Sequence, residues 1–200
     1  MQADKFSAQL DNSLLLTRYA PFNPANPSFQ SPSLGGLFKL GIKDIMEDYR
    51  LYGGYKIPTT VNGSEYLLCF ENNKKRLDHK LTYYRLSRPV SSNEEEVPFD
   101  TAIISPQNLP LEYNIKSKYF EWQLKYAFDP VQAIRFGVAY RNDKYVYRAS
   151  NYESLNLLPY TTNWVLLRAE YIFDNTYELA TNLRRGFRCR VFAEVHKELP

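Results

Sequence analysis

The chain has 200 residues, of which 24% are charged and 16% aromatic, and its formal net charge is +3. This small net charge, with Lys and Arg mixed among Asp and Glu, excludes a strongly basic protein that binds nucleic acid. No stretch approaches the about 18 consecutive apolar residues of a transmembrane helix, but alternating membrane strands average out as polar and are not excluded.

The first part of the chain is expected to be irregular. Residues 1–35 contain four prolines and several Asn and Ser, and they show little periodicity. This composition is typical of a lead-in or linker. From residue 36 onward, apolar runs of strand length recur between turn residues, and no helical pattern is long enough to compete. Residues 36–200 are therefore predicted to form a β-barrel, or part of one.

Alternation of apolar and polar residues indicates the strands, because successive side chains of a strand point to opposite faces of a sheet. Four early segments show this alternation: 37–42, 49–57, 66–71 and 77–84. Turn residues, among them Pro58, Gly63, Asn72 and Asn73, separate them. The sequence predicts that they are antiparallel strands.

The clearest signal comes from segments 120–128 and 132–141, in which large apolar residues occupy every second position. Between them stands Asp129-Pro130, a tight-turn sequence. These two segments are predicted to form a hairpin.

A second hairpin is predicted from segments 165–173 and 187–196, with its turn at Asp174-Asn175-Thr176. About eight antiparallel strands are then expected. The predicted fold class is all-β: an up-and-down meander that forms a transmembrane β-barrel or half of a larger one.

Connection lengths give an independent indication. In a meander, alternate connections lie at the same end of the sheet. The connections over residues 88–114 and 142–159 are long and fall at one end, whereas the two predicted turns are short and fall at the other. Outer-membrane barrels have this asymmetry. The short connection from Pro58 to Gly63 departs from it.

The two faces of the predicted strands differ in chemistry. The apolar faces are rich in Phe, Trp and Tyr near strand ends, as in the aromatic girdles of membrane barrels. The opposite faces of the last two strands carry Arg168, Glu170, Arg188, Arg190 and Glu194. These residues are predicted to form an ion-pair network inside the barrel lumen, which would fix strand register, set ion selectivity or hold a plug. The alternative is a soluble lipocalin-like barrel that binds an apolar ligand.

Three segments carry a family resemblance: Ser64 to Asp78, Leu40 to Arg50 and Glu170 to Thr176. Together they resemble the C-terminal barrel region of large outer-membrane proteins that begin with a TolB-like β-propeller, and more distantly the BamA/surface-antigen superfamily. The resemblance implies the outer membrane of a Gram-negative cell. It also implies that this chain is a fragment of a longer exported precursor, whose periplasmic propeller precedes it and whose remaining strands follow it. The absence of a signal peptide at Met1 fits that expectation.

No nucleophile elbow, P-loop or dinucleotide fingerprint occurs. Glu194 and His196 share a strand face and could contact a metal ion together, but a solvated or lumen pair is the favoured interpretation. The sequence therefore predicts no catalytic, cofactor or metal site and no enzymatic activity. The expected partners are membrane lipid and the rest of the parent chain. The expected function is a membrane anchor, or a translocation or assembly pore, within a larger protein.

Overall fold

The computed structural model describes residues 2–11, 15–16, 34–58, 63–91, 112–148, 158–180 and 183–199. Within these ranges no helix is long and apolar enough to cross a membrane. The strands are β1 (Gln2–Asp11), β2 (Gly35–Lys43), β3 (Tyr49–Pro58), β4 (Ser64–Asn72), β5 (Leu77–Ser91), β6 (Glu112–Ala127), β7 (Gln132–Tyr147), β8 (Tyr160–Asp174), β9 (Tyr177–Ala180), β10 (Leu183–Arg185) and β11 (Arg188–Leu199).

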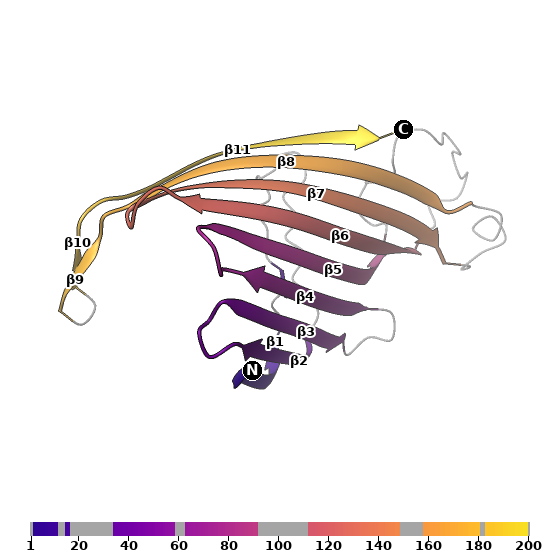
Figure 1. The fold of residues 1–200 in the computed structure, drawn as a ribbon. Helices are drawn as coiled ribbons and strands as arrows, with labels where there is room; N and C mark the ends of the chain where they lie inside the picture. Colours follow the sequence, from indigo (N-terminus) through magenta and orange to yellow (C-terminus); the bar gives the residue numbers. More distant parts are fainter. Residues whose placement is uncertain are drawn as a thin grey trace.

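One antiparallel sheet contains nine of these strands, in the order β1-β2-β3-β4-β5-β6-β7-β8-β11. Each strand pairs with the strand before it in the sheet, which makes an up-and-down meander (Figure 1). The sheet is open: β1 and β11 lie at its two edges and do not pair with each other. The predicted all-β antiparallel meander is confirmed, with one strand more than the expected eight in the main sheet.

The extra strand is β1, within the segment that was expected to be irregular. It pairs with β2 along its whole length, with a bulge between Ala3 and Lys5. Phe6, Ala8 and Leu10 alternate with polar neighbours, so the two-residue period of a strand is present there. The prediction of an irregular lead-in is wrong for residues 2–11. The rest of that segment lies outside the described residues, apart from Leu15, Leu16, Leu34 and Gly35, the first residue of β2.

The turn between β6 and β7 forms where the sequence predicts it. Asp129 Oδ1 accepts hydrogen bonds from the backbone N–H groups of Val131 (2.9 Å) and Gln132 (2.7 Å). The backbone N–H of Phe128 donates to the carbonyl of Gln132 at 3.0 Å. A short acidic side chain thus satisfies the turn backbone and closes the longest hairpin of the sheet.

The connection after β8 differs from the predicted tight turn. The chain does form a local turn at Asp174, whose Oδ1 accepts hydrogen bonds from the N–H (3.2 Å) and the hydroxyl (2.6 Å) of Thr176. It then continues into a small hairpin, β9–β10, which projects beyond the main sheet (Figure 1). Gly186, at φ +130°, turns the chain into β11. The prediction of a turn at Asp174 is confirmed, but this turn leads into the β9–β10 hairpin and does not connect β8 directly to β11.

The cross-strand register aligns side chains of similar character on each face of the sheet. We call one of the two faces the apolar face. One row of its side chains runs across β3 to β11 and consists of Leu51, Phe70, Leu81, Trp122, Val138, Leu167 and Val195. The second, which we call the polar face, is marked by Lys56, Glu65, Thr82, Glu121, Arg135, Asp143, Arg168 and Glu170.

Burial is inverted relative to an ordinary soluble sheet. Large side chains of the apolar face are open, with Trp122 43% and Leu167 45% exposed, whereas Lys56 and Glu170 on the polar face are 2% and 3% exposed. Soluble proteins bury charged residues only rarely and seldom expose contiguous apolar surface on this scale. In a soluble sheet packed on a hydrophobic core, the apolar side chains would be buried and the charged ones exposed. This sheet has the opposite distribution.

Candidate functional site

The strongest electrostatic feature of the polar face is centred on Glu170. Its side chain is 1% exposed. Arg135 Nη1 donates to its Oε1 (3.1 Å), Arg190 Nη2 donates to its Oε2 (2.9 Å), and Arg168 Nη2 lies 3.3 Å from Oε2. Arg168 also reaches Glu194 Oε2 at 3.4 Å. A buried carboxylate with three guanidinium partners is well compensated, because Arg135 and Arg190 donate charge-assisted hydrogen bonds and Arg168 adds an ion pair.

The structure brings together four of the five residues expected in the network: Arg168, Glu170, Arg190 and Glu194. The fifth, Arg188, pairs with Asp174 at the turn end of β8. Sequence reasoning missed Arg135, because it belongs to the preceding hairpin and only the β7–β8 register places it opposite Glu170. The alternation of β7 already put Arg135 on the charged face, so that signal was available.

A second buried ion pair lies nearer the other edge of the polar face. Lys56 Nζ is 3.9 Å from Glu65 Oε1, and the two side chains are 3% and 7% exposed. Glu65 Oε2 also accepts hydrogen bonds from the Tyr84 hydroxyl (3.3 Å) and from the backbone N–H of Leu15 (3.0 Å). Leu15 lies directly over Gly54, where an added Cβ would come within 2.6 Å of its Cδ2.

Leu15 and Leu16 also pack against an apolar cluster in the middle of the polar face, formed by Tyr84, Tyr119, Ala139 and Leu166. An apolar cluster on a polar face is stabilised when other apolar side chains shield it from water, and Leu15 and Leu16 contribute to this shielding. The contact joins a segment before β2 to four strands of the sheet.

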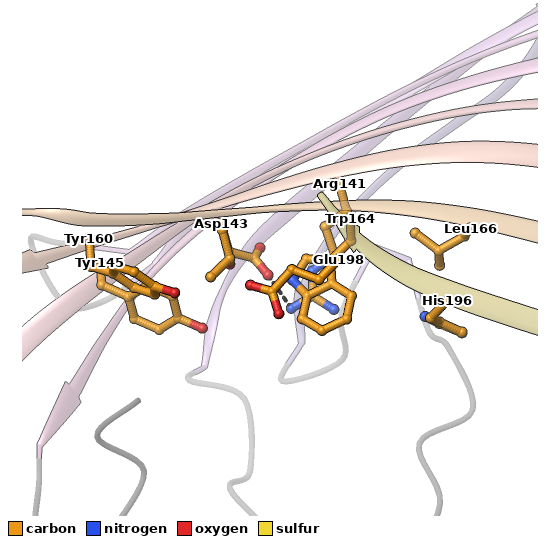
Figure 2. Close-up of a pocket in the computed structure, with 9 residues that line it drawn as sticks. Arg141, Asp143, Tyr145, Tyr160, Trp164, Leu166, His196 and Glu198 are labelled. Atoms are coloured by element: carbon orange, nitrogen blue, oxygen red, sulfur yellow. Dashed lines mark ion pairs between the residues drawn. The ribbon is translucent and has the colours of Figure 1, made fainter. Parts of the chain in front are cut away.

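A cavity of about 390 Å³ opens on the polar face near the ends of β7, β8 and β11 (Figure 2). Asp143, 1% exposed, forms an ion pair with Arg141, while its Oδ1 atom has no hydrogen-bond partner. The Thr162 hydroxyl is likewise buried without a partner, and the register sets Thr162 opposite Asp143. The lining residues are Arg141, Asp143, Tyr145, Tyr160, Thr162, Trp164, Leu166, His196 and Glu198.

Ion pairs also hold the short turns at the opposite end of the sheet. Glu47, between β2 and β3, has its carboxyl pKa lowered by a hydrogen bond from Lys43 and then by one from Arg50. A hydrogen bond from Arg188, assisted by Thr176, lowers the pKa of Asp174 to about 2. Both carboxylates lie outside the apolar stretches of the strands.

The apolar face forms a continuous band. On β8 it runs from Val165 to Phe173, which is about 27 Å along the strand at about 3.4 Å per residue. With the roughly 40° tilt of membrane strands this gives about 20 Å along the membrane normal, close to the apolar band of about 25 Å in outer-membrane barrels. At one end the band gives way to a polar row across β5 to β8, formed by Arg85, Lys118, Asn142 and Asn163.

Tyrosines lie toward the borders of this band. Tyr55 stacks on Tyr66 with ring centroids 4.7 Å apart, beside the polar row. Tyr126 packs edge-on against Phe128 at the other border, 5.3 Å between centroids. Within the described strands, the apolar face carries no Asp, Glu, Lys or Arg between these borders on β6 and β7.

Among the described residues, no group of three or more His, Cys, Asp or Glu side chains comes together to hold a metal ion. No family model matches the chain, and neither do any of the curated proteins or solved structures to which it was compared.

Proposed function

We propose that this chain is the membrane-embedded sheet of an outer-membrane β-barrel, with its apolar face against lipid and its polar face toward the lumen. The observation that carries the proposal is the inverted burial: buried charged side chains on one face and a continuous band of exposed apolar side chains on the other. In a transmembrane barrel, the outward residues are apolar and the interior is polar. The chain would act as a membrane anchor, or as part of a translocation or assembly pore.

The dimensions of the band support the proposal. Its height of about 20 Å suits a bilayer, and its tyrosine borders lie where interfacial aromatic residues are found in membrane proteins. Two connections at the end near the polar row, 92–111 and 148–159, are long, although 59–63 at that end is short. The connections 44–48 and 128–131 at the other end are short. This is the loop asymmetry of outer-membrane barrels.

The open edges indicate a further partner. In hydrocarbon each backbone N–H or C=O without a hydrogen bond costs several kcal/mol, because water cannot replace the missing partner. Strands β1 and β11 each have one side unpaired within the described sheet. The proposal therefore includes additional strands that pair with these edges, as expected if the chain is part of a longer outer-membrane protein of the kind it resembles.

The lipocalin-like alternative requires the apolar side chains to gather on the enclosed face of the sheet. The side chains that line the polar face include Glu65, Glu121 and Glu170, all under 9% exposed, and these would oppose an apolar ligand. That distribution favours the membrane barrel.

The two tryptophans provide a direct test, because Trp122 lies on the apolar face and Trp164 on the polar face. The chain contains no others. The chain would be refolded into vesicles with brominated acyl chains, as Trp164→Phe to report Trp122 and as Trp122→Phe to report Trp164. We expect strong quenching of Trp122 and weak quenching of Trp164.

Equal quenching of the two tryptophans, or stronger quenching of Trp164, would contradict the proposed arrangement of faces. A folded, monodisperse monomer in buffer without detergent would contradict the membrane assignment and favour the soluble carrier.

A further inference from the structure

The cavity on the polar face combines two kinds of lining, aromatic and polar. One wall is aromatic: Tyr145 and Tyr160 have ring centroids 6.1 Å apart, with an angle of 35° between their planes, and Trp164 lies nearby. The other groups are polar, with Asp143 and Thr162 deeply buried. Figure 2 shows Asp143, Tyr145, Tyr160 and Trp164 on one side of the sheet, and the lining residues come from the neighbouring strands β7, β8 and β11.

The buried polar groups are incompletely satisfied. Asp143 Oδ2 is paired with Arg141, but Asp143 Oδ1 and the Thr162 hydroxyl have no partner. Buried polar atoms in folded proteins nearly always have hydrogen-bond partners, and each exception calls for an explanation. A carboxylate only accepts, whereas a hydroxyl both donates and accepts. A ligand that satisfies both must therefore present a hydrogen-bond donor to Asp143 Oδ1 and a donor or acceptor to Thr162.

The charges of the cavity disfavour an ionic ligand. Asp143 and Glu198 would repel an anion. The charge of Asp143 is already balanced by its ion pair with Arg141, so its unpartnered Oδ1 requires a hydrogen-bond donor and not a further positive charge. The required groups are neutral hydroxyls, and the aromatic wall suits a ring with an apolar C–H surface. Ligand sites of this kind combine flat apolar contacts with a few placed polar groups.

We propose that this cavity binds a neutral saccharide, with a pyranose ring against Tyr145, Tyr160 and Trp164 and its hydroxyls on Asp143 and Thr162. The site lies on the face opposite the apolar band. Saccharide binding is therefore independent of what covers the apolar face. The membrane proposal and the saccharide proposal can each fail without the other.

The test uses the full chain carrying Trp122→Phe, so that Trp164 in the cavity is the remaining fluorophore. Maltose and cellobiose would be titrated into the folded protein in detergent, with circular dichroism to establish that the strands are formed. We expect a saturable change in Trp164 emission with at least one of the two disaccharides, at concentrations up to about 100 mM, which covers dissociation constants in the millimolar range. Glycerol at matched concentration should give no saturable change.

Two isosteric substitutions separate a ligand site from a structural role. Asp143→Asn should weaken saccharide binding by about tenfold, which corresponds to about 1.4 kcal/mol. Thr162→Val should weaken binding as well, yet leave the urea midpoint of unfolding unchanged or higher, because it removes a buried hydroxyl that lacks a partner. Lys125→Gln, on the same face but in the lining of a different hollow, should leave the affinity unchanged.

The inference is overturned if the folded protein gives no saturable response to either disaccharide. It is also overturned if Ca²⁺ or inorganic phosphate produces the saturable change and the disaccharides do not, or if Asp143→Asn and Thr162→Val both bind with unchanged affinity.

Discussion

The apolar face makes a quantitative prediction for a charge placed on it. Ala169 lies on that face in β8, opposite Phe136 on one side and Ala193 on the other, in the row next to that of Trp122. Ala169→Arg adds a guanidinium to the lipid-facing band without removing a large side chain. Arg at the midplane of a membrane barrel costs about 2–4 kcal/mol on the lipid face. This corresponds to a loss of about 30- to 900-fold in the ratio of folded to unfolded protein, at about 1.4 kcal/mol per tenfold.

A matched control is Gln123→Arg, because Gln123 lies on the polar face in the centre of β6. Its neighbours on this face include Glu121, and Gln123 itself lines a hollow of about 300 Å³. The lining also contains the carboxylates Glu71 and Asp78 and the cations Arg50, Lys80, Lys125 and Arg135. Added charge on this face remains hydrated or paired, so we expect the cost to stay below about 1 kcal/mol.

The measurement is urea-dependent folding into phosphatidylcholine vesicles, followed by tryptophan emission and by migration on unheated SDS gels. The unfolding midpoint of Ala169→Arg should fall well below that of Gln123→Arg. Equal losses for the two variants, or a larger loss for Gln123→Arg, would refute the assignment of faces.

Ala139 is unsuitable as the control, although it also lies on the polar face, because it is 4% exposed and packed against Tyr119 and Leu166.

Three further predictions concern the polar face and the turns. Glu170→Gln should lower the free energy of unfolding by about 1–3 kcal/mol in the same urea titration, because three arginines lose a buried anionic partner. Glu194→Gln should lower it by less. Equal losses of stability for the two variants would contradict the central role of Glu170. Because the pKa of Asp174 is lowered from 3.8 to about 2, its pair with Arg188 stabilises the fold above pH 4, and that contribution is lost as pH falls toward 2. Asp174→Asn should reduce the pH dependence of the unfolding midpoint in that window, and an unchanged slope would argue against the pair. Gly186→Ala should cost about 1–3 kcal/mol, since its Cβ would lie 2.6 Å from a backbone oxygen at φ +130°, and wild-type stability would contradict that geometry.

Much of the fold followed from period-two alternation, which is a local property of the sequence. The hairpin around Asp129 was predictable because both its strands and its turn residues are unambiguous. Strand β1 was missed because its short alternating pattern precedes a proline-rich stretch, and that stretch dominated the interpretation of the whole segment. The β9–β10 extension was missed because turn residues at Asp174 specify a change of direction but not where the next long strand begins.

The site was less predictable, because it depends on contacts between strands far apart in the sequence. Alternation placed Glu170 and its arginine neighbours on one face. Only the pairing register shows that Arg135 lies opposite Glu170, and only the structure shows that Arg188 pairs with Asp174. The cavity near Asp143 gave no sequence signal. Its unpartnered oxygens and its aromatic wall come from two strands, β7 and β8, and only their register brings them together.

The meander also bears on how such a sheet is assembled and how it can change. Except for β8 and β11, which pair across the β9–β10 hairpin, each pairing in the main sheet joins strands that are consecutive along the chain. Contacts between nearby segments carry a smaller loop-closure cost than distant ones, so the sheet can grow by adding one strand to an existing edge. The same order allows a whole hairpin to be duplicated or lost without rewiring any other strand. A sheet of this topology can therefore be widened or narrowed in steps of two strands while both of its faces keep their chemistry.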